Sequence, residues 1–175
     1  MGETYDARRE IPGWDTGDFD DGSWPPVDAA ETITAKIEAY PGVPVRQFRE
    51  IKPVKMEEVP GSQTSAPSQL TTDNRQLTTA CVYDMGTNLA GFVRLRVRGA
   101  QPGQTIVLRF AERLNPDGTI YTTNLRTARA TDTYICKGDV QETWQPRFTF
   151  HGFQYVELTG YPGKPDLDTI TGVEL

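Results

Sequence analysis

Residues 83–99 read YDMGTNLAGFVRLRVRG, and this stretch decides how the chain folds. From residue 93 onward, valine or leucine at 93, 95 and 97 alternates with arginine at 94, 96 and 98. A period of two indicates a β-strand with one buried face and one face in water. The preceding segment Asp84–Asn88 has the polar and glycine residues of a tight turn, so we expect the strand to begin after it.

The next stretch repeats this pattern. After a Gly/Pro turn at Gly99–Gly103, apolar residues at 106, 108 and 110 alternate with valine and arginine at 107 and 109. Asn115–Gly118 then has the residues of a type I turn, with Asn first, Pro second and Gly fourth. The sequence therefore predicts an all-β fold, an antiparallel β-sandwich or jelly roll, without long helices. Further short strands are predicted at residues 131–136, 142–144, 148–150, 154–159 and 170–175.

Length and charge limit the class of protein and its partners. The chain has 175 residues, enough for one domain with its own core, and a net charge of -6 at pH 7. The negative charge argues against nucleic acid and anionic membranes as partners. The N-terminus lacks the basic flank and apolar core of a signal peptide, which favours the cytoplasm, although a fragment of a longer chain would lack them too.

Residues 1–28 differ from the rest of the chain. They hold an acidic stretch between Asp15 and Asp21, together with Trp14 and Trp24. Carboxylates in such number suit calcium, but no register places a Glu at the twelfth position of an EF-hand loop. We therefore expect a solvated loop whose tryptophans lie against a surface, and no metal site.

Three segments connect this loop to the predicted strands. Residues 29–40 fit a helical turn or a short strand. Residues 45–59 fit an edge strand, because Pro53 cannot donate a hydrogen bond to a central ladder. Residues 60–79 are rich in Ser, Thr, Gln and Pro, which predicts an exposed loop.

Motifs for nucleophilic, metal or cofactor chemistry are missing. Cys81 and Cys136 lie inside predicted strands, and without a Cys-x-x-Cys motif we expect two buried thiols. His151 is the single histidine, and no Gly-x-Ser-x-Gly elbow or phosphate-binding glycine loop accompanies it. We expect His151 to be a packed residue at a strand end, and we expect no cofactor.

Two interpretations directed at carbohydrate stay open. Glu112, Asp117 and Asp132 lie near strand ends, where a pair of carboxylates could hydrolyse a glycoside, or where they could hold turns and pair with arginines. Alternatively, exposed aromatic rings of a sandwich could stack on sugars. The aromatic candidates are Tyr121, Tyr134, Trp144 and Tyr161.

Five segments, taken in order, resemble bacterial α-L-rhamnosidases. The sequence departs from the family pattern at Thr87, Phe92 and Gln154, where Gln, Trp and Arg are usual. An arginine at 154 would offer a planar, charged donor to a carboxylate, so contacts at this position are in question. The five segments are GETYDAR at 2–8, YDMGTNLAGF at 83–92, FAERLNPDGTIY at 110–121, NLRTARATD at 124–132 and PRFTFHGFQYV at 146–156.

The resemblance implies a place within a larger enzyme. Residues 1–28 are similar to the tail of an N-terminal β-domain, and residues 29–175 to the concanavalin-like β-sandwich that precedes the catalytic domain. The implied function is a non-catalytic accessory domain of a glycoside hydrolase acting on terminal α-L-rhamnose, with the other domains of that glycosidase as partners. The alternative is a carbohydrate-binding module for rhamnose-containing glycans. No catalytic residue is assigned, and the residues expected to contact carbohydrate or a neighbouring domain are Asp84, Asn88, Glu112, Arg126, Asp132, Trp144, Arg147 and His151.

Overall fold

The structure, a computed structural model, describes residues 2–28, 34–60 and 80–175. These residues form nine strands and two short 3₁₀ helices without an α-helix, which confirms the predicted all-β class. Among them, no helix has the length and apolar character needed to cross a membrane. The elements are β1 (Thr4–Asp6), η1 (Ala7–Arg9), β2 (Arg49–Ile51), β3 (Lys55–Val59), β4 (Ala80–Arg98), β5 (Thr105–Ala111), η2 (Thr123–Leu125), β6 (Thr131–Ile135), β7 (Gln141–Trp144), β8 (His151–Thr159) and β9 (Ile170–Glu174).

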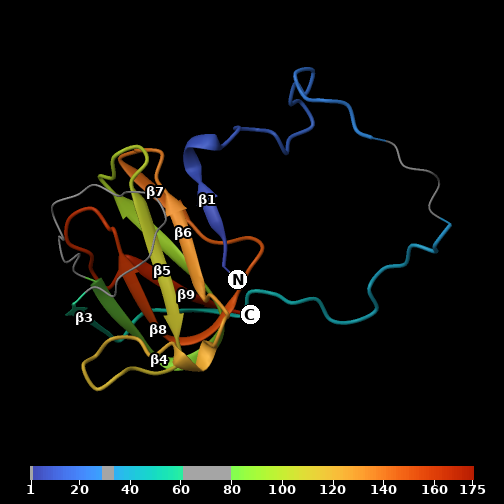
Figure 1. The fold of residues 1–175 in the computed structure, drawn as a ribbon. Coiled ribbons are helices and arrows are strands. Elements are labelled where there is room, and N and C mark those ends of the chain that lie inside the picture. The colour runs from blue at the N-terminus through green and yellow to red at the C-terminus, as the bar shows by residue number, and fades with distance from the viewer. Residues whose placement is uncertain (1, 29–33, 61–79) are drawn as a thin grey trace.

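Strand β4 connects the two halves of one curled sheet (Figure 1). Its first half pairs with β3 and β8, and its second half pairs with β9 and β7. The order through the sheet is β1-β6-β5-β8-β4-β9-β2, and every pairing is antiparallel except that of β1 with β6. A strand of 19 residues can serve both halves only by bending, so the sheet closes over one core.

The alternating pattern of the sequence produces this core. Val93, Leu95 and Val97 of β4 are fully buried, while the arginines between them are partly or wholly exposed. Ile106, Leu108 and Phe110 of β5 belong to the same apolar cluster, as predicted. Cys81 and Cys136 are buried free thiols, also as predicted. A second, smaller cluster on the outer face consists of Val59, Ala80, Val82, Ala111 and Ile120.

The predicted turn at Asp84–Asn88 is wrong, because β4 continues through it. The pairing of β4 with β8 shifts register between Asp84 and Leu89, which marks a β-bulge. Gly86 has a φ of 72°, and the Asp84 carboxylate accepts its backbone N–H at 2.7 Å. A bulge and a turn need the same Asp and Gly chemistry, so the local sequence does not separate them.

The predicted turns around β5 and β6 are confirmed. Gly99 and Gly103 have φ angles of 69° and 85° at the two ends of the first turn. In the second turn the Gly118 N–H donates to the Asn115 carbonyl at 3.0 Å, and a bridge between Leu114 and Ile120 closes a hairpin.

Two predicted strands need correction. The edge strand at 45–59 is two strands, β2 and β3, which are interrupted around Pro53 and lie at margins of the sheet. Residues 148–150 form no strand, and Phe148 and Phe150 are exposed. The backbone N–H of Phe148 donates instead to the Glu3 carboxylate, which removes it from any ladder.

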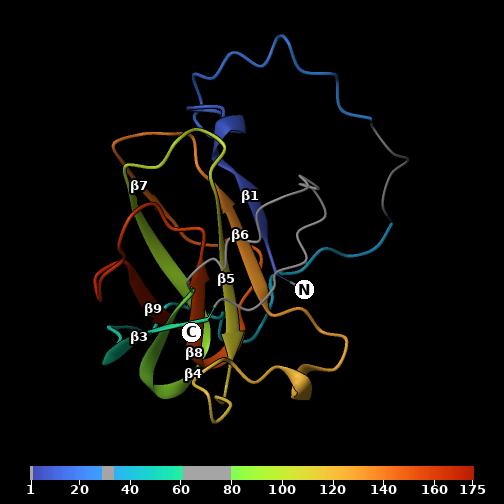
Figure 2. The same cartoon turned by 60° about the vertical axis from the view of Figure 1, so that its left-hand side comes forward.

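The N-terminal segment joins the sheet and then leaves it. Strand β1 lies beside β6, residues 10–28 run away from the sheet, and residues 34–48 return to it at β2 (Figures 1 and 2). Trp14 and Trp24 are about half exposed, so the expectation that both tryptophans lie against a surface is wrong; the ring of Trp24 packs on Phe19, in the same segment. Residues 34–40 have no regular structure, whereas 29–33 and 61–79, where parts of two predictions fall, lie outside the described residues.

Candidate functional site

A chain of contacts at one end of the sheet connects most of the residues selected from the sequence. His151 is the first residue of β8 and Asp132 lies near the start of β6, on either side of the end of β5. The antiparallel order β6-β5-β8 brings these ends together. Asn88, Glu112 and Arg147 lie at the same end of the sheet. Asn88 contacts Glu112, and Arg147 binds Glu3.

His151 and Asp132 form a buried pair. The imidazole stacks on Phe110 with ring centroids 4.3 Å apart, and its Nε2 lies 3.1 Å from Asp132 Oδ1. The same Oδ1 accepts the backbone N–H of Glu3 at 2.9 Å, while Oδ2 is buried without a hydrogen-bond partner. His151 is thus packed at a strand end, as predicted, and Asp132 is fully buried and cannot touch a sugar.

Glu3 links this buried pair to the segment before β8. Its carboxylate Oε2 accepts the backbone N–H groups of Arg147 and Phe148 at 3.0 and 2.9 Å. Gly2 lies so close to β6 that a Cβ there would be 1.7 Å from the Thr131 carbonyl oxygen, so the backbone can approach only with glycine. Sequence reasoning missed Glu3 as a site residue, and only its place in the segment GETYDAR marked it.

The bulge of β4 places two further residues at this end. Asp84 Oδ1 accepts a hydrogen bond from the Gln154 side chain at 3.0 Å. A carboxylate that could pair with an arginine at position 154 is therefore present, and Gln154 binds it with one neutral donor. Asn88 is exposed and its amide lies 3.5 Å from Glu112 Oε1, a long contact.

Two of the predicted contact residues lie apart from this group. Trp144 is 7% exposed and stacks on Tyr134 at 5.3 Å, so its ring belongs to the core. Tyr134 is also buried and donates its hydroxyl to Glu142 at 2.7 Å. Arg126 follows η2, is exposed, and has the positive φ of 54°.

The three acids considered for hydrolysis do not face one another as a pair in solvent. Asp132 is buried, and Asp117 accepts from the Thr119 backbone and hydroxyl at 3.1 and 2.7 Å. Those hydrogen bonds lower the pKa of Asp117. Of these three acids, only Glu112 is exposed and lacks a short hydrogen bond to another described residue. Within the same part of the chain, His, Cys, Asp and Glu side chains form no group suited to a metal ion.

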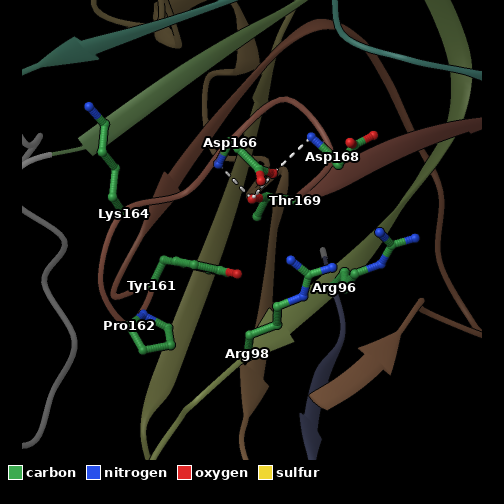
Figure 3. A pocket seen from close by; sticks show the side chains of 8 residues that line it. All are labelled: Arg96, Arg98, Tyr161, Pro162, Lys164, Asp166, Asp168 and Thr169. Atoms are coloured by element: carbon green, nitrogen blue, oxygen red, sulfur yellow. Dashed lines mark hydrogen bonds between the residues drawn. The ribbon is translucent and has the colours of Figure 1, made fainter. Parts of the chain in front are cut away.

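A hollow of about 120 Å³ lies elsewhere, on the outer face of β4 (Figure 3). The side chains of Arg98 and Tyr161 extend toward the same space, while Lys164 points away from it (Figure 3). Asp168 binds Lys52 at 3.1 Å, and this ion pair lowers the pKa of Asp168. The lining residues are Arg96, Arg98, Tyr161, Pro162, Lys164, Asp166, Asp168 and Thr169.

The hollow could be found only in part from the sequence. The alternation of residues 93–98 predicted that the arginines face water, and Tyr161 was an aromatic candidate. Their meeting depends on the segment before β9, which returns over β4 because the Arg96 N–H donates to the Thr169 carbonyl at 2.8 Å. The guanidinium groups of Arg96 and Arg98 make no hydrogen bond within the described residues, and their positive charges help to lower the pKa of Asp168.

Sequence models of two domain families match this chain. The bacterial alpha-L-rhamnosidase concanavalin-like domain matches residues 74–175, and the alpha-L-rhamnosidase N-terminal domain matches residues 1–49. The two matched regions meet in the structure where β1 pairs with β6.

Individual alpha-L-rhamnosidases agree with these matches. An alpha-L-rhamnosidase of Streptomyces avermitilis is 49% identical over 173 residues, which are 98% of this chain and 15% of the relative. One from Formosa agariphila is 36% identical over 177 residues, 98% of this chain and 17% of the relative. The chain therefore spans about a sixth of the length of these relatives.

Solved structures show the same fold. The alpha-L-rhamnosidase from Dictyoglumus thermophilum has a TM-score of 0.83 and 41% identity, over 99% of this chain and 18% of that one. The Streptomyces avermitilis enzyme complexed with L-rhamnose has a TM-score of 0.79 and 46% identity, over 98% and 15%. Since the concanavalin-like match covers more than half of the residues, the chain belongs to the bacterial alpha-L-rhamnosidase family, of which it has the concanavalin-like domain.

Proposed function

We propose that this chain is a non-catalytic accessory domain of an α-L-rhamnosidase, a glycoside hydrolase acting on terminal α-L-rhamnose. One observation carries the proposal: nearly all of the chain aligns with only 15–18% of several α-L-rhamnosidases. In this proposal the chemistry belongs to a catalytic domain outside these 175 residues, and the β-sheet supports that domain. The division into a tail at 1–28 and a sandwich at 29–175 stays a prediction.

The surface of the chain supports a role beside other domains. In the described part of residues 11–48, most large apolar side chains are 45–94% exposed, which is unfavourable in water and typical of surfaces that a partner covers. The predicted contact residues Asn88, Glu112 and Arg147 are also exposed, at the end of the sheet described above. An accessory domain would use such surfaces to contact its neighbours.

The test has two parts, both using an aryl α-L-rhamnoside. The purified chain alone should give no turnover above buffer. A graft, the Streptomyces avermitilis enzyme with its aligned segment replaced by this chain, should retain activity within about tenfold of the unmodified enzyme, since the two segments share one fold. Turnover by the chain alone, at a level that persists on repurification, would contradict the proposal, and so would an inactive graft.

A second candidate function is binding of rhamnose-containing carbohydrate at the hollow of Figure 3. The supporting observation is that a partly exposed aromatic residue, Tyr161, and two arginines, Arg96 and Arg98, line one depression. An aromatic face with a few polar groups is the usual composition of a sugar site. In this proposal Arg98 donates to ring hydroxyls or to a carboxylate on a neighbouring sugar.

Titration of the chain with L-rhamnose and rhamnosylated oligosaccharides, with and without calcium, tests this candidate. Saturable chemical-shift changes at millimolar sugar should appear in β4 and residues 161–169. They should disappear in Arg98→Ala and persist in Arg46→Ala, which removes an exposed arginine from a different segment. No saturable response would remove this candidate without touching the accessory role.

A further inference from the structure

The segment between β7 and β8 exposes two phenylalanines. Phe148 is 92% exposed and Phe150 is 60% exposed, while Pro146 before them and His151 after them are buried. A single exposed apolar residue is ordinary on a protein surface, but two large rings one residue apart on a short segment form an apolar protrusion.

The structure holds this segment in place with buried polar groups. The Glu3 carboxylate fixes its beginning through the N–H groups of Arg147 and Phe148, and His151 fixes its end by pairing with Asp132. Asp132 in turn holds Glu3 through its backbone N–H. This set of hydrogen bonds requires the Asp132 carboxylate to be buried with one oxygen unpaired, which is unfavourable. A segment that is ordered before contact loses little conformational entropy when a partner binds it.

The position of the segment indicates which partner covers it. Glu3 lies in the region that matches the N-terminal rhamnosidase domain, and Phe148 lies in the concanavalin-like region. The segment therefore continues an existing contact between two family domains, in which β1 pairs with β6. Nearly all of this chain aligns with these relatives, and more than four-fifths of each relative lies outside the aligned segment.

We propose that Phe148 and Phe150 dock into an apolar depression of another domain of the same rhamnosidase. In this proposal Arg147, exposed beside them, pairs with a carboxylate on the rim of that depression; the Glu3 carboxylate binds its backbone N–H and not its side chain. This inference rests on the proposed accessory function and names the surface through which the domain acts.

The test compares Phe148→Ser/Phe150→Ser in the isolated chain and in the Streptomyces avermitilis graft. In the isolated chain the melting temperature should stay unchanged, since both rings are exposed. In the graft the half-life of activity at elevated temperature should fall about tenfold or more, because one buried phenylalanine contributes at least that factor. Val140→Ser is the matched control: Val140 is 90% exposed, in the connection between β6 and β7, and its loss should change neither protein.

Each remaining outcome counts against a stated part of the proposal. An active graft whose lifetime is unchanged by the double substitution would overturn the docking inference alone. An inactive wild-type graft would contradict both the accessory function and the docking inference. A dimer of the isolated chain in sedimentation, lost in the double variant, would assign the surface to a second copy and overturn the proposal.

Discussion

The segment at 10–48 and the sheet built on β4 use similar residues with opposite results. In the sheet, apolar side chains at alternate positions are buried against partner strands. In the described part of 10–48, large apolar side chains remain exposed: Ile11, Trp14, Trp24, Val27, Ile37, Tyr40, Val43, Val45 and Phe48. Apolar content alone therefore does not make a core in this molecule.

Backbone hydrogen bonding explains the difference. Every core strand exchanges backbone bonds with at least one neighbour, and β4 does so with four, whereas residues 34–47 make none with another described residue. Prolines at 12, 25, 26, 41 and 44 remove donors along the segment. Without a ladder, the cost of ordering the chain is not offset, so the segment depends on contacts from outside it.

Proteolysis should separate the two regions by the largest factor. Trypsin should cut after Lys36 and Arg46 at least about a thousandfold faster than after Arg109 in β5, because cleavage inside the sheet requires unfolding. A time course followed by mass spectrometry measures both rates. Equal lifetimes of the two regions would contradict the comparison.

Truncating one side chain in each region should give the largest difference in stability. Phe110→Ala removes a fully buried ring that contacts His151 and Phe153, and should cost about 3–5 kcal/mol of unfolding free energy. Trp14→Ala, in the exposed segment, should change it by less than about 0.5 kcal/mol. Urea unfolding measures both, and a large effect of Trp14→Ala would show that the segment shares the core.

Glycine substitutions should show a smaller difference. Gly118 has a φ of 83°, so Gly118→Val should destabilise the domain by roughly 1 kcal/mol or more. Gly17, in the exposed segment, has open space around it and no positive φ, so Gly17→Val is the matched control and should be neutral. Thermal unfolding is the measurement, and an unchanged melting temperature for Gly118→Val would contradict the expected strain in this turn.

The smallest effect concerns a buried charge in the sheet. Burial raises the pKa of Glu157, against the opposing effect of Arg109 at 2.8 Å. A carboxyl whose folded pKa is raised stabilises the fold below its unfolded pKa, and this contribution is lost as the pH rises through the folded pKa. Glu157→Gln should therefore reduce the gain in stability on acidification, measured as urea midpoints between pH 7 and pH 4. A larger gain in the variant than in the unmodified chain would contradict this prediction.

Local patterns predicted the fold where the backbone is satisfied locally or by neighbouring strands. The alternation in β4 and β5 and the turn at Asn115–Gly118 are such cases, and both are confirmed. The pattern failed at 148–150, because the partner of the Phe148 N–H is a carboxylate 145 residues away. No local signal reveals a bond of that sequence separation.

The candidate site could be predicted residue by residue but not as an arrangement. His151 and Asp132 were each selected, yet their pairing follows from the strand order β6-β5-β8. Trp144 was selected as a strand aromatic, and its ring lies in the core because residue type does not state which face of a strand it occupies. Glu3 needed the fold, since β1 reaches β6 across the whole sequence.

Hydrogen exchange can show whether the sheet is complete in this chain and whether residues 34–47 need the neighbouring domains that we propose. The isolated chain and the Streptomyces avermitilis graft are compared peptide by peptide. We predict equal protection of β4, β5 and β8 in both proteins, and protection of residues 34–47 in the graft only. Strong protection of 34–47 in the isolated chain, or none in an active graft, would contradict this prediction.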